Sequence, residues 1–134
     1  MIDIENELYD LLAQRIRAEY PDANITSTYV PSPAEFPAVS IEMMDNVPYR
    51  NTQDSSTMEH DVDNLFEINV MSNKTRGKKA ECKAIAALID GAMLSLGFNR
   101  SYMRPTQNLL NVTVYQITAR YQAVVSADKT IYRR

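Results

Sequence analysis

The sequence is poor in the residue types that most catalytic and metal sites need. Its 134 residues include one histidine, one cysteine, three glycines and no tryptophan. The single cysteine, Cys82, excludes an intrachain disulfide, and its place in a helical pattern predicts a small buried side chain in a reducing compartment. The sequence also lacks an apolar run long enough to cross a membrane. We therefore expect one globular domain of ordinary composition and no membrane partner.

Catalytic motifs are missing as well. His60 lies far along the chain from Cys82, and no nucleophile-elbow glycines surround the cysteine. The basic run 72–79 looks at first like a phosphate loop, but that motif needs glycine at Ser72 and serine or threonine at Lys79. We therefore predict that the protein is not an enzyme and has neither catalytic residues nor a cofactor.

A short acidic segment, residues 59–63, gathers side chains that can bind metal ions. In an extended strand, Glu59, Asp61 and Asp63 would share one face. The loop glycine and the closing glutamate of an EF-hand are absent at the required spacing. A solvated acidic edge is the simpler interpretation, so we predict no metal site.

Hydrophobic spacing predicts two helices. The first is capped by Asp3, ends at Tyr20-Pro21 and has an apolar stripe at helical spacing, formed by Ile4, Leu8, Leu11, Leu12 and Ile16. The second is capped by Asn73 or Thr75. Gly97 can end it in the left-handed conformation, with Phe98 packing back on the last turn. Its expected core stripe is Ile85, Leu88, Ile89, Ala92 and Leu96.

Alternating apolar residues predict five strands, at residues 25–30, 38–44, 65–71, 98–103 and 112–125. In the last of these, Tyr115, Ile117 and Tyr121 share one face, whereas Gln116 and Thr118 lie on the other. The order of elements is therefore αβββαββ. This order predicts an α+β fold with a mainly antiparallel sheet and two helices packed on one face.

The polar segment 45–64 allows two interpretations. It is either a long loop, or the flanking strands continue as a hairpin arm that turns near Asp54. We expect a single domain over residues 1–125, with a mobile arm at about residues 45–60 and a C-terminal tail at residues 126–134. Residues 46–58 and 127–134 should be poorly ordered in the free subunit, because polar segments without an apolar period cannot offset their ordering entropy.

The charge is divided unevenly along the chain. Residues 1–73 carry 14 acidic and 3 basic residues, a net charge of −11, whereas residues 74–134 carry 3 acidic and 11 basic residues, a net charge of +8. If both halves interleave in one domain, these charges mix. The alternative is a subunit with an acidic and a basic face, which suits head-to-tail association with copies of itself.

Two charged clusters are the candidate contact residues under this alternative. The basic start of the second helix would meet the acidic arm of a neighbouring copy, a contact between two different patches that can close into a ring. The basic cluster is Lys74, Arg76, Lys78 and Lys79. The acidic cluster is Asp54, Glu59, Asp61 and Asp63.

Three runs in the second half of the chain resemble a known family. They are Glu67-Ile68-Asn69-Val70-Met71-Ser72-Asn73-Lys74 with Gly77-Lys78-Lys79-Ala80-Glu81, then Leu96-Gly97-Phe98-Asn99-Arg100, and last Val114-Tyr115-Gln116-Ile117-Thr118-Ala119-Arg120-Tyr121-Gln122-Ala123. The family consists of small proteins of phages and prophages of Gram-positive bacteria, described as minor capsid, head–tail joining or tail-completion proteins. The αβββαββ order is also similar to the tail-terminator fold of lambda-like siphophages.

This resemblance implies a structural role at the head–tail junction of the virion. The subunit would form a hexameric ring that caps the tail tube and docks to the head connector, so its partners would be itself, the tail tube protein and a head-closure protein. The family has no catalytic residues to transfer. A head-closure or stopper protein is the nearest alternative. A nucleic-acid-binding regulator and a small enzyme with an unrecognised site are more distant ones. Specific nucleic-acid binding is not favoured, because the pI is about 5.1 and the basic residues are not interleaved with exposed aromatics.

Overall fold

The computed structural model describes residues 3–48, 61–108 and 110–126. The elements follow in the predicted order αβββαββ, so the α+β fold class is confirmed. Their bounds are α1 (Glu5–Glu19), β1 (Asn24–Thr26), β2 (Ala38–Pro48), β3 (Asp61–Ser72), α2 (Lys78–Leu96), β4 (Asn99–Gln107) and β5 (Tyr115–Ser126).

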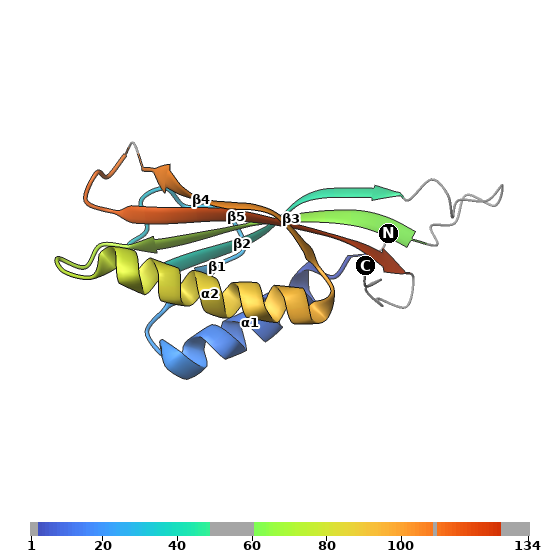
Figure 1. Cartoon of the computed structure of the whole chain (residues 1–134), viewed down its shortest axis with the longest axis horizontal. Helices are drawn as coiled ribbons and strands as arrows, with labels where there is room; N and C mark the ends of the chain where they lie inside the picture. Colours follow the sequence, from blue (N-terminus) through green and yellow to red (C-terminus); the bar gives the residue numbers. More distant parts are fainter. Residues whose placement is uncertain (1–2, 49–60, 109, 127–134) are drawn as a thin grey trace.

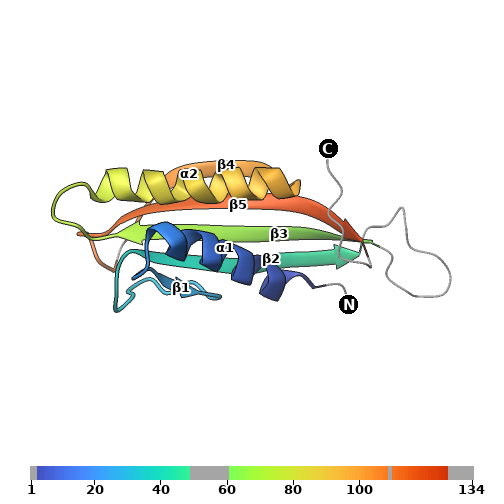
Figure 2. The ribbon, with the colours of Figure 1, turned by 90° about the horizontal axis from the view of Figure 1, so that it is seen from below.

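The strands form one sheet of five, in the order β1-β2-β3-β5-β4. All neighbouring strands are antiparallel except β1, which pairs in parallel with β2. Both helices lie on the same face of the sheet, with α1 over the β2 side and α2 over the β5 side (Figures 1 and 2). The strand order therefore places the N-terminal elements along one edge of the sheet and α2 with β4 along the other.

The main core fills the space between the two helices and the sheet. Leu12 and Ile16 of α1 and Ile85 and Ile89 of α2 are almost fully buried there. The sheet contributes the inward half of each alternating strand, led by Phe66, Ile68, Ile117 and Tyr121. Burying one such large side chain stabilises a fold by about 1.5–3 kcal/mol, so this face alone accounts for the position of the helices.

The ends of the two helices follow different rules. At the start of α1 the capping position is Ile4, one residue after the predicted Asp3, and it makes no side-chain cap bond; the Asp3 carboxylate still accepts the Glu5 N–H at 2.8 Å. The start of α2 departs from prediction, because Gly77 occupies the capping position in a left-handed conformation and no side chain caps the helix. At the other end, Gly97 is left-handed and the Phe98 N–H reaches back to the Met93 carbonyl, as predicted.

Several strand boundaries differ from the predicted ones. β1 ends at Thr26 instead of residue 30, since the following chain leaves the sheet edge and crosses its other face. β2 continues to Pro48 and β3 begins at Asp61, so the flanking strands extend through residues 45–48 and 61–64, as the hairpin interpretation expects and the long-loop interpretation does not. The expected turn near Asp54 and the rest of the segments predicted to be poorly ordered, residues 49–58 and 127–134, lie outside the described residues. β4 continues through Pro105 to Gln107, which an edge strand tolerates. β5 includes Ser126, first assigned to the tail.

Candidate functional site

The only cysteine is placed as a structural residue. Cys82 is fully buried on the core side of α2, and its Sγ lies 3.2 Å from the Tyr115 carbonyl oxygen. Burial, aided by the nearby Glu81 carboxylate, raises the pKa of the Cys82 thiol to about 12. The thiol is therefore neutral near pH 7, and a neutral thiol is a poor nucleophile.

The acidic segment divides at the edge of the described chain. His60 and Glu59 lie outside the described residues. Asp61 is buried, and both carboxylate oxygens of Asp63 accept hydrogen bonds from the Gln122 amide at 2.8 and 2.9 Å. Within the described residues no group of three or more histidine, cysteine, aspartate or glutamate side chains could hold a metal ion.

The basic start of α2 is partly engaged within the subunit. Lys74 forms a 2.8 Å ion pair with the buried Glu81, whose other oxygen accepts the Ser72 hydroxyl at 2.7 Å. The bond to Glu81 raises the pKa of Lys74. Lys78 donates to the Thr113 carbonyl oxygen at 2.9 Å. Of the four predicted contact cations, Arg76 and Lys79 have exposed side chains that form no hydrogen bond or ion pair with the described residues.

The two predicted contact clusters lie at opposite ends of the same strand. Asp61 begins β3, and the basic turn follows directly after its last residue, Ser72. Eleven steps along a strand span roughly 36 Å. The described residues of the acidic cluster therefore cannot reach the basic cluster of their own subunit. Asp54 and Glu59 lie outside the described residues, so this pairing stays a prediction about contacts between copies.

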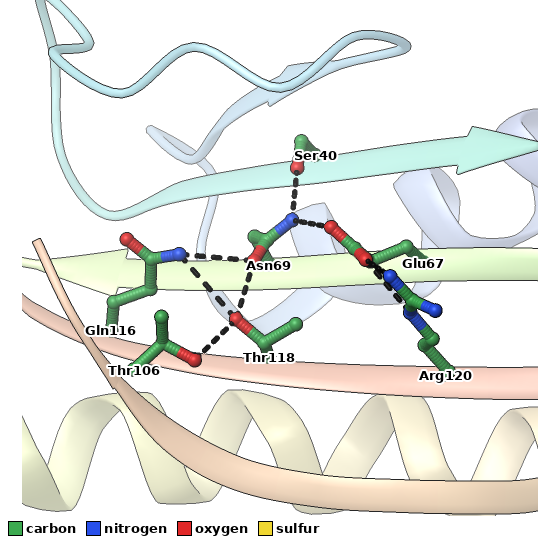
Figure 3. Close-up of polar contacts among 7 residues, drawn as sticks. All are labelled: Ser40, Glu67, Asn69, Thr106, Gln116, Thr118 and Arg120. Atoms are coloured by element: carbon green, nitrogen blue, oxygen red, sulfur yellow. Dashed lines mark hydrogen bonds and ion pairs between the residues drawn. The ribbon is translucent and has the colours of Figure 1, made fainter. Parts of the chain in front are cut away.

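The sheet face opposite the helices carries a chain of polar contacts that crosses four strands (Figure 3). Asn69 of β3 lies at its centre. Its side-chain oxygen Oδ1 accepts hydrogen bonds from the Thr118 hydroxyl at 2.6 Å and from the Gln116 side-chain amide at 3.0 Å. Its side-chain nitrogen Nδ2 donates to Ser40 and Glu67. Three further contacts complete the chain: the Thr106 hydroxyl and the Gln116 amide each donate to the Thr118 hydroxyl oxygen, and Arg120 forms a 2.9 Å ion pair with Glu67.

This open face is covered at one end by the loop between β1 and β2. The Tyr29 hydroxyl donates to Gln116, and the Asn108 amide donates to the Pro31 carbonyl oxygen at 2.8 Å. Gln116 is consequently only 3% exposed although no described helix lies over it. Farther along, a hollow of about 330 Å³ is lined by Asp63, Arg120 and Gln122 among others, but these three side chains already bind one another or Glu67. These three side chains are therefore engaged within the subunit, whereas Asp45, Ser101 and Tyr102 also line the hollow.

Charge is segregated across the sheet. Residues 3–48, which form α1, β1 and β2, carry nine acidic and two basic residues, a net charge of −7. Residues 73–107, which form α2 and β4, carry seven basic and two acidic residues, a net charge of +5. These groups of elements lie on opposite sides of the central strands and come together where α1 packs against α2, so the charges are largely separated. The predicted division into an acidic and a basic side therefore agrees with the strand order.

We name the two sides by their exposed residues. The acidic flank gathers around β1 and consists of Asp10, Asp22 and Glu35. The basic flank runs along α2 and β4 and consists of Lys79, Lys83 and Arg104. The pattern of charge along the sequence indicated two opposed faces, but it could not place them, since their positions depend on β5 lying between β3 and β4.

Comparison with known proteins gives no match, either to a protein-family model or to a curated sequence. No helix in the described part of the chain is long and apolar enough to cross a membrane. The function must therefore be argued from the geometry and from the sequence resemblance.

Proposed function

We propose that this protein is a tail-completion subunit of a long-tailed phage, which forms a hexameric ring that caps the tail tube and docks to the head connector. The observation that carries the proposal is the separation of charge to opposite edges of one sheet. A subunit with unlike edges favours contacts in which one edge meets the other edge of the next copy. Such heterologous contacts form a ring when the rotation between copies closes.

Capping a tube requires a body with two unlike faces. A tube that grows by adding identical rings always presents the same end, so a terminator must match that end on one face and differ on the other. The subunit supports this requirement in two ways. Its helical face and its open sheet face differ in chemistry, because helices cover one and a chain of polar contacts crosses the other. Along the described elements, the order αβββαββ is also not an exact two-fold repeat.

The first predicted contact can be tested by charge reversal at the start of α2. The double variant Lys78→Glu and Lys79→Glu should block assembly and leave the fold intact, since acidic side chains are favourable in the first turn of a helix. Assembly would be measured by electron microscopy and folding by circular dichroism. Unchanged assembly of this variant would remove the basic start of α2 from the contact.

The function itself is tested with tail tubes. Purified protein added to polymerising tube subunits should give shorter tubes with a capped end, as measured by negative-stain electron microscopy. Bovine albumin at equal concentration serves as the inert control. A phage that lacks the gene should build filled heads without joined tails, and tails of uncontrolled length. Normal-length tails beside heads that leak DNA would contradict the proposal and favour head closure.

A further inference from the structure

We infer that a second copy of this chain binds the basic flank through its acidic flank, so that α2 and β4 of one subunit face α1 and β1 of the next. This inference rests on the proposed ring, in which each subunit needs two different contacts with its neighbours. The acidic partner surface of the neighbouring copy is its β1 edge, whereas the sequence analysis predicted its arm at about residues 45–60. Both flanks consist of residues with described positions.

The basic flank contains a groove suited to a partner surface. A hollow of about 310 Å³ lies between α2 and β4, with an apolar floor that includes Ala87, Met103 and Pro105. Lys83, Arg100 and Arg104 line it. Its one acidic lining residue, Asp90, is already bound to Arg100 at 3.1 Å and to the Tyr121 hydroxyl at 2.7 Å. The groove therefore combines apolar area with exposed positive charge, which fits an acidic protein surface.

The acidic flank draws its three carboxylates from α1, from the turn before β1 and from the segment after it. Tyr9, which directly precedes Asp10 on α1, ties this helix to β1, because its hydroxyl donates to the Ile25 carbonyl oxygen at 2.7 Å. Glu35 lies beside the same strand, where its backbone carbonyl oxygen accepts a hydrogen bond from the side-chain amide of Asn24. Asp22 is in the turn that leads into β1. Three exposed carboxylates thus surround the edge opposite the basic flank.

Side chains, and not a continued sheet, must make this contact. β1 is only three residues long, which gives a neighbouring strand little backbone to pair with. β4 carries Pro105 and an irregular register between Arg100 and Tyr102. Proline, positive charge and a bulge are the features that prevent an edge strand from pairing with another strand. Charge complementarity across the flanks is therefore the interaction that remains.

The first experiment reverses one flank. The double variant Lys79→Glu and Lys83→Glu should weaken self-association of the full chain at least about tenfold in Kd, because two attractive pairs become repulsive. Sedimentation velocity over a concentration series measures the effect. The matched control, Arg15→Glu with Arg17→Glu on α1, changes the net charge equally but adds negative charge to the acidic side. It should associate as well as the wild type or better.

The second experiment restores the complementarity. A chain that combines Lys79→Glu and Lys83→Glu with Asp10→Lys and Asp22→Lys has both flanks reversed, so it should associate again. Circular dichroism of each variant measures whether it is folded. If every variant is folded, recovery of association in the combined chain reports restored charge complementarity. Three results would overturn the inference: a wild type that stays monomeric at low salt, equal losses in the test and control variants, or no recovery in the combined chain.

These outcomes are separate from those of the proposed function. A wild type that associates through the flanks but does not cap tail tubes would refute the terminator role and keep the contact. Capping that survives the Lys79 and Lys83 reversal would keep the role and refute the contact. Loss of association without recovery in the combined chain would point to a different acidic partner for the basic flank.

Discussion

Removing the side chain of Asn69 should reveal how much the open sheet face contributes to stability. Asn69 is 3% exposed and makes four side-chain hydrogen bonds, to Ser40, Glu67, Gln116 and Thr118. In the variant Asn69→Ala the amide of Gln116 and the hydroxyl of Thr118 lose their shared acceptor. The Glu67 carboxylate loses one donor but keeps Arg120.

The magnitude follows from which groups are left without partners. A buried donor that loses its acceptor costs about 1–3 kcal/mol. Thr118 can turn its hydroxyl toward the exposed Thr106, so it is partly compensated, whereas the amide of the 3% exposed Gln116 keeps only its long 3.4 Å bond to Thr118. We therefore expect a loss of about 2–4 kcal/mol in the free energy of unfolding. For a domain whose total is about 5–15 kcal/mol, this is a large fraction.

Equilibrium unfolding in urea, followed by circular dichroism, measures the loss. The midpoint should fall by about 1–2 M, since a small domain loses about 1–3 kcal/mol per molar urea. The matched control is Thr106→Ala at the exposed end of the same contact chain, where solvent can replace the lost bond and the expected loss is below about 1 kcal/mol. If Asn69→Ala costs no more than this control, the contact chain does not stabilise the fold.

Three further perturbations have definite signs. Gly91→Ala should raise the free energy of unfolding by about 0.5–1 kcal/mol, because Gly91 lies inside α2 and an added Cβ meets nothing within 4 Å. Gly97→Ala should lower the free energy of unfolding by about 1–2 kcal/mol, because Gly97 has a φ of 102°, which is strained for alanine. Thermal unfolding of both variants compares them directly. Cys82 should resist thiol reagents in the native state at neutral pH and react on unfolding. Since its pKa is raised from 9.0 to about 12, its contribution to stability is complete below pH 9.0 and is lost as pH rises through about 12, which alkaline unfolding measures.

Much of the fold could be predicted because local patterns agree with tertiary packing. The stripe of α1 buries one face, and the alternation from Tyr115 to Ala123 directs the apolar residues of β5 into the core under the helices. On the other face of β5, Gln116 and Thr118 are buried as well, which alternation alone does not predict. Boundaries failed where a tertiary contact decides the conformation. Asn73 and Thr75 are good capping residues, but the left-handed Gly77 begins α2 instead. The chain after Thr26 leaves the sheet because the Pro31 carbonyl oxygen is held by Asn108, 77 residues away in sequence.

The sequence could predict which charged residues are candidates for the contact, but not which of them already bind other groups of the same subunit. The sequence shows four cations before and in the first turn of α2, but it cannot show that Lys74 pairs with Glu81 and that Lys78 reaches Thr113. The sequence also gives no sign that the side-chain amide of Gln122, on β5, binds the carboxylate of Asp63. Such pairings depend on register between distant strands. The flanks depend on strand order, which periodicity does not specify.

The salt dependence of self-association should reveal the symmetry of the contact. A two-fold contact would place a flank against the same flank of the partner, so Lys79 and Lys83 would meet their own copies and repel. Lowering the salt would then weaken association, because the Debye length grows from about 8 Å at physiological ionic strength to about 30 Å at 0.01 M. A head-to-tail contact joins unlike flanks, and lowering the salt should strengthen it. Sedimentation of the wild type at both ionic strengths decides the sign. Association that grows with added salt would refute the head-to-tail arrangement, since only contacts between like charges or purely apolar surfaces behave in that way.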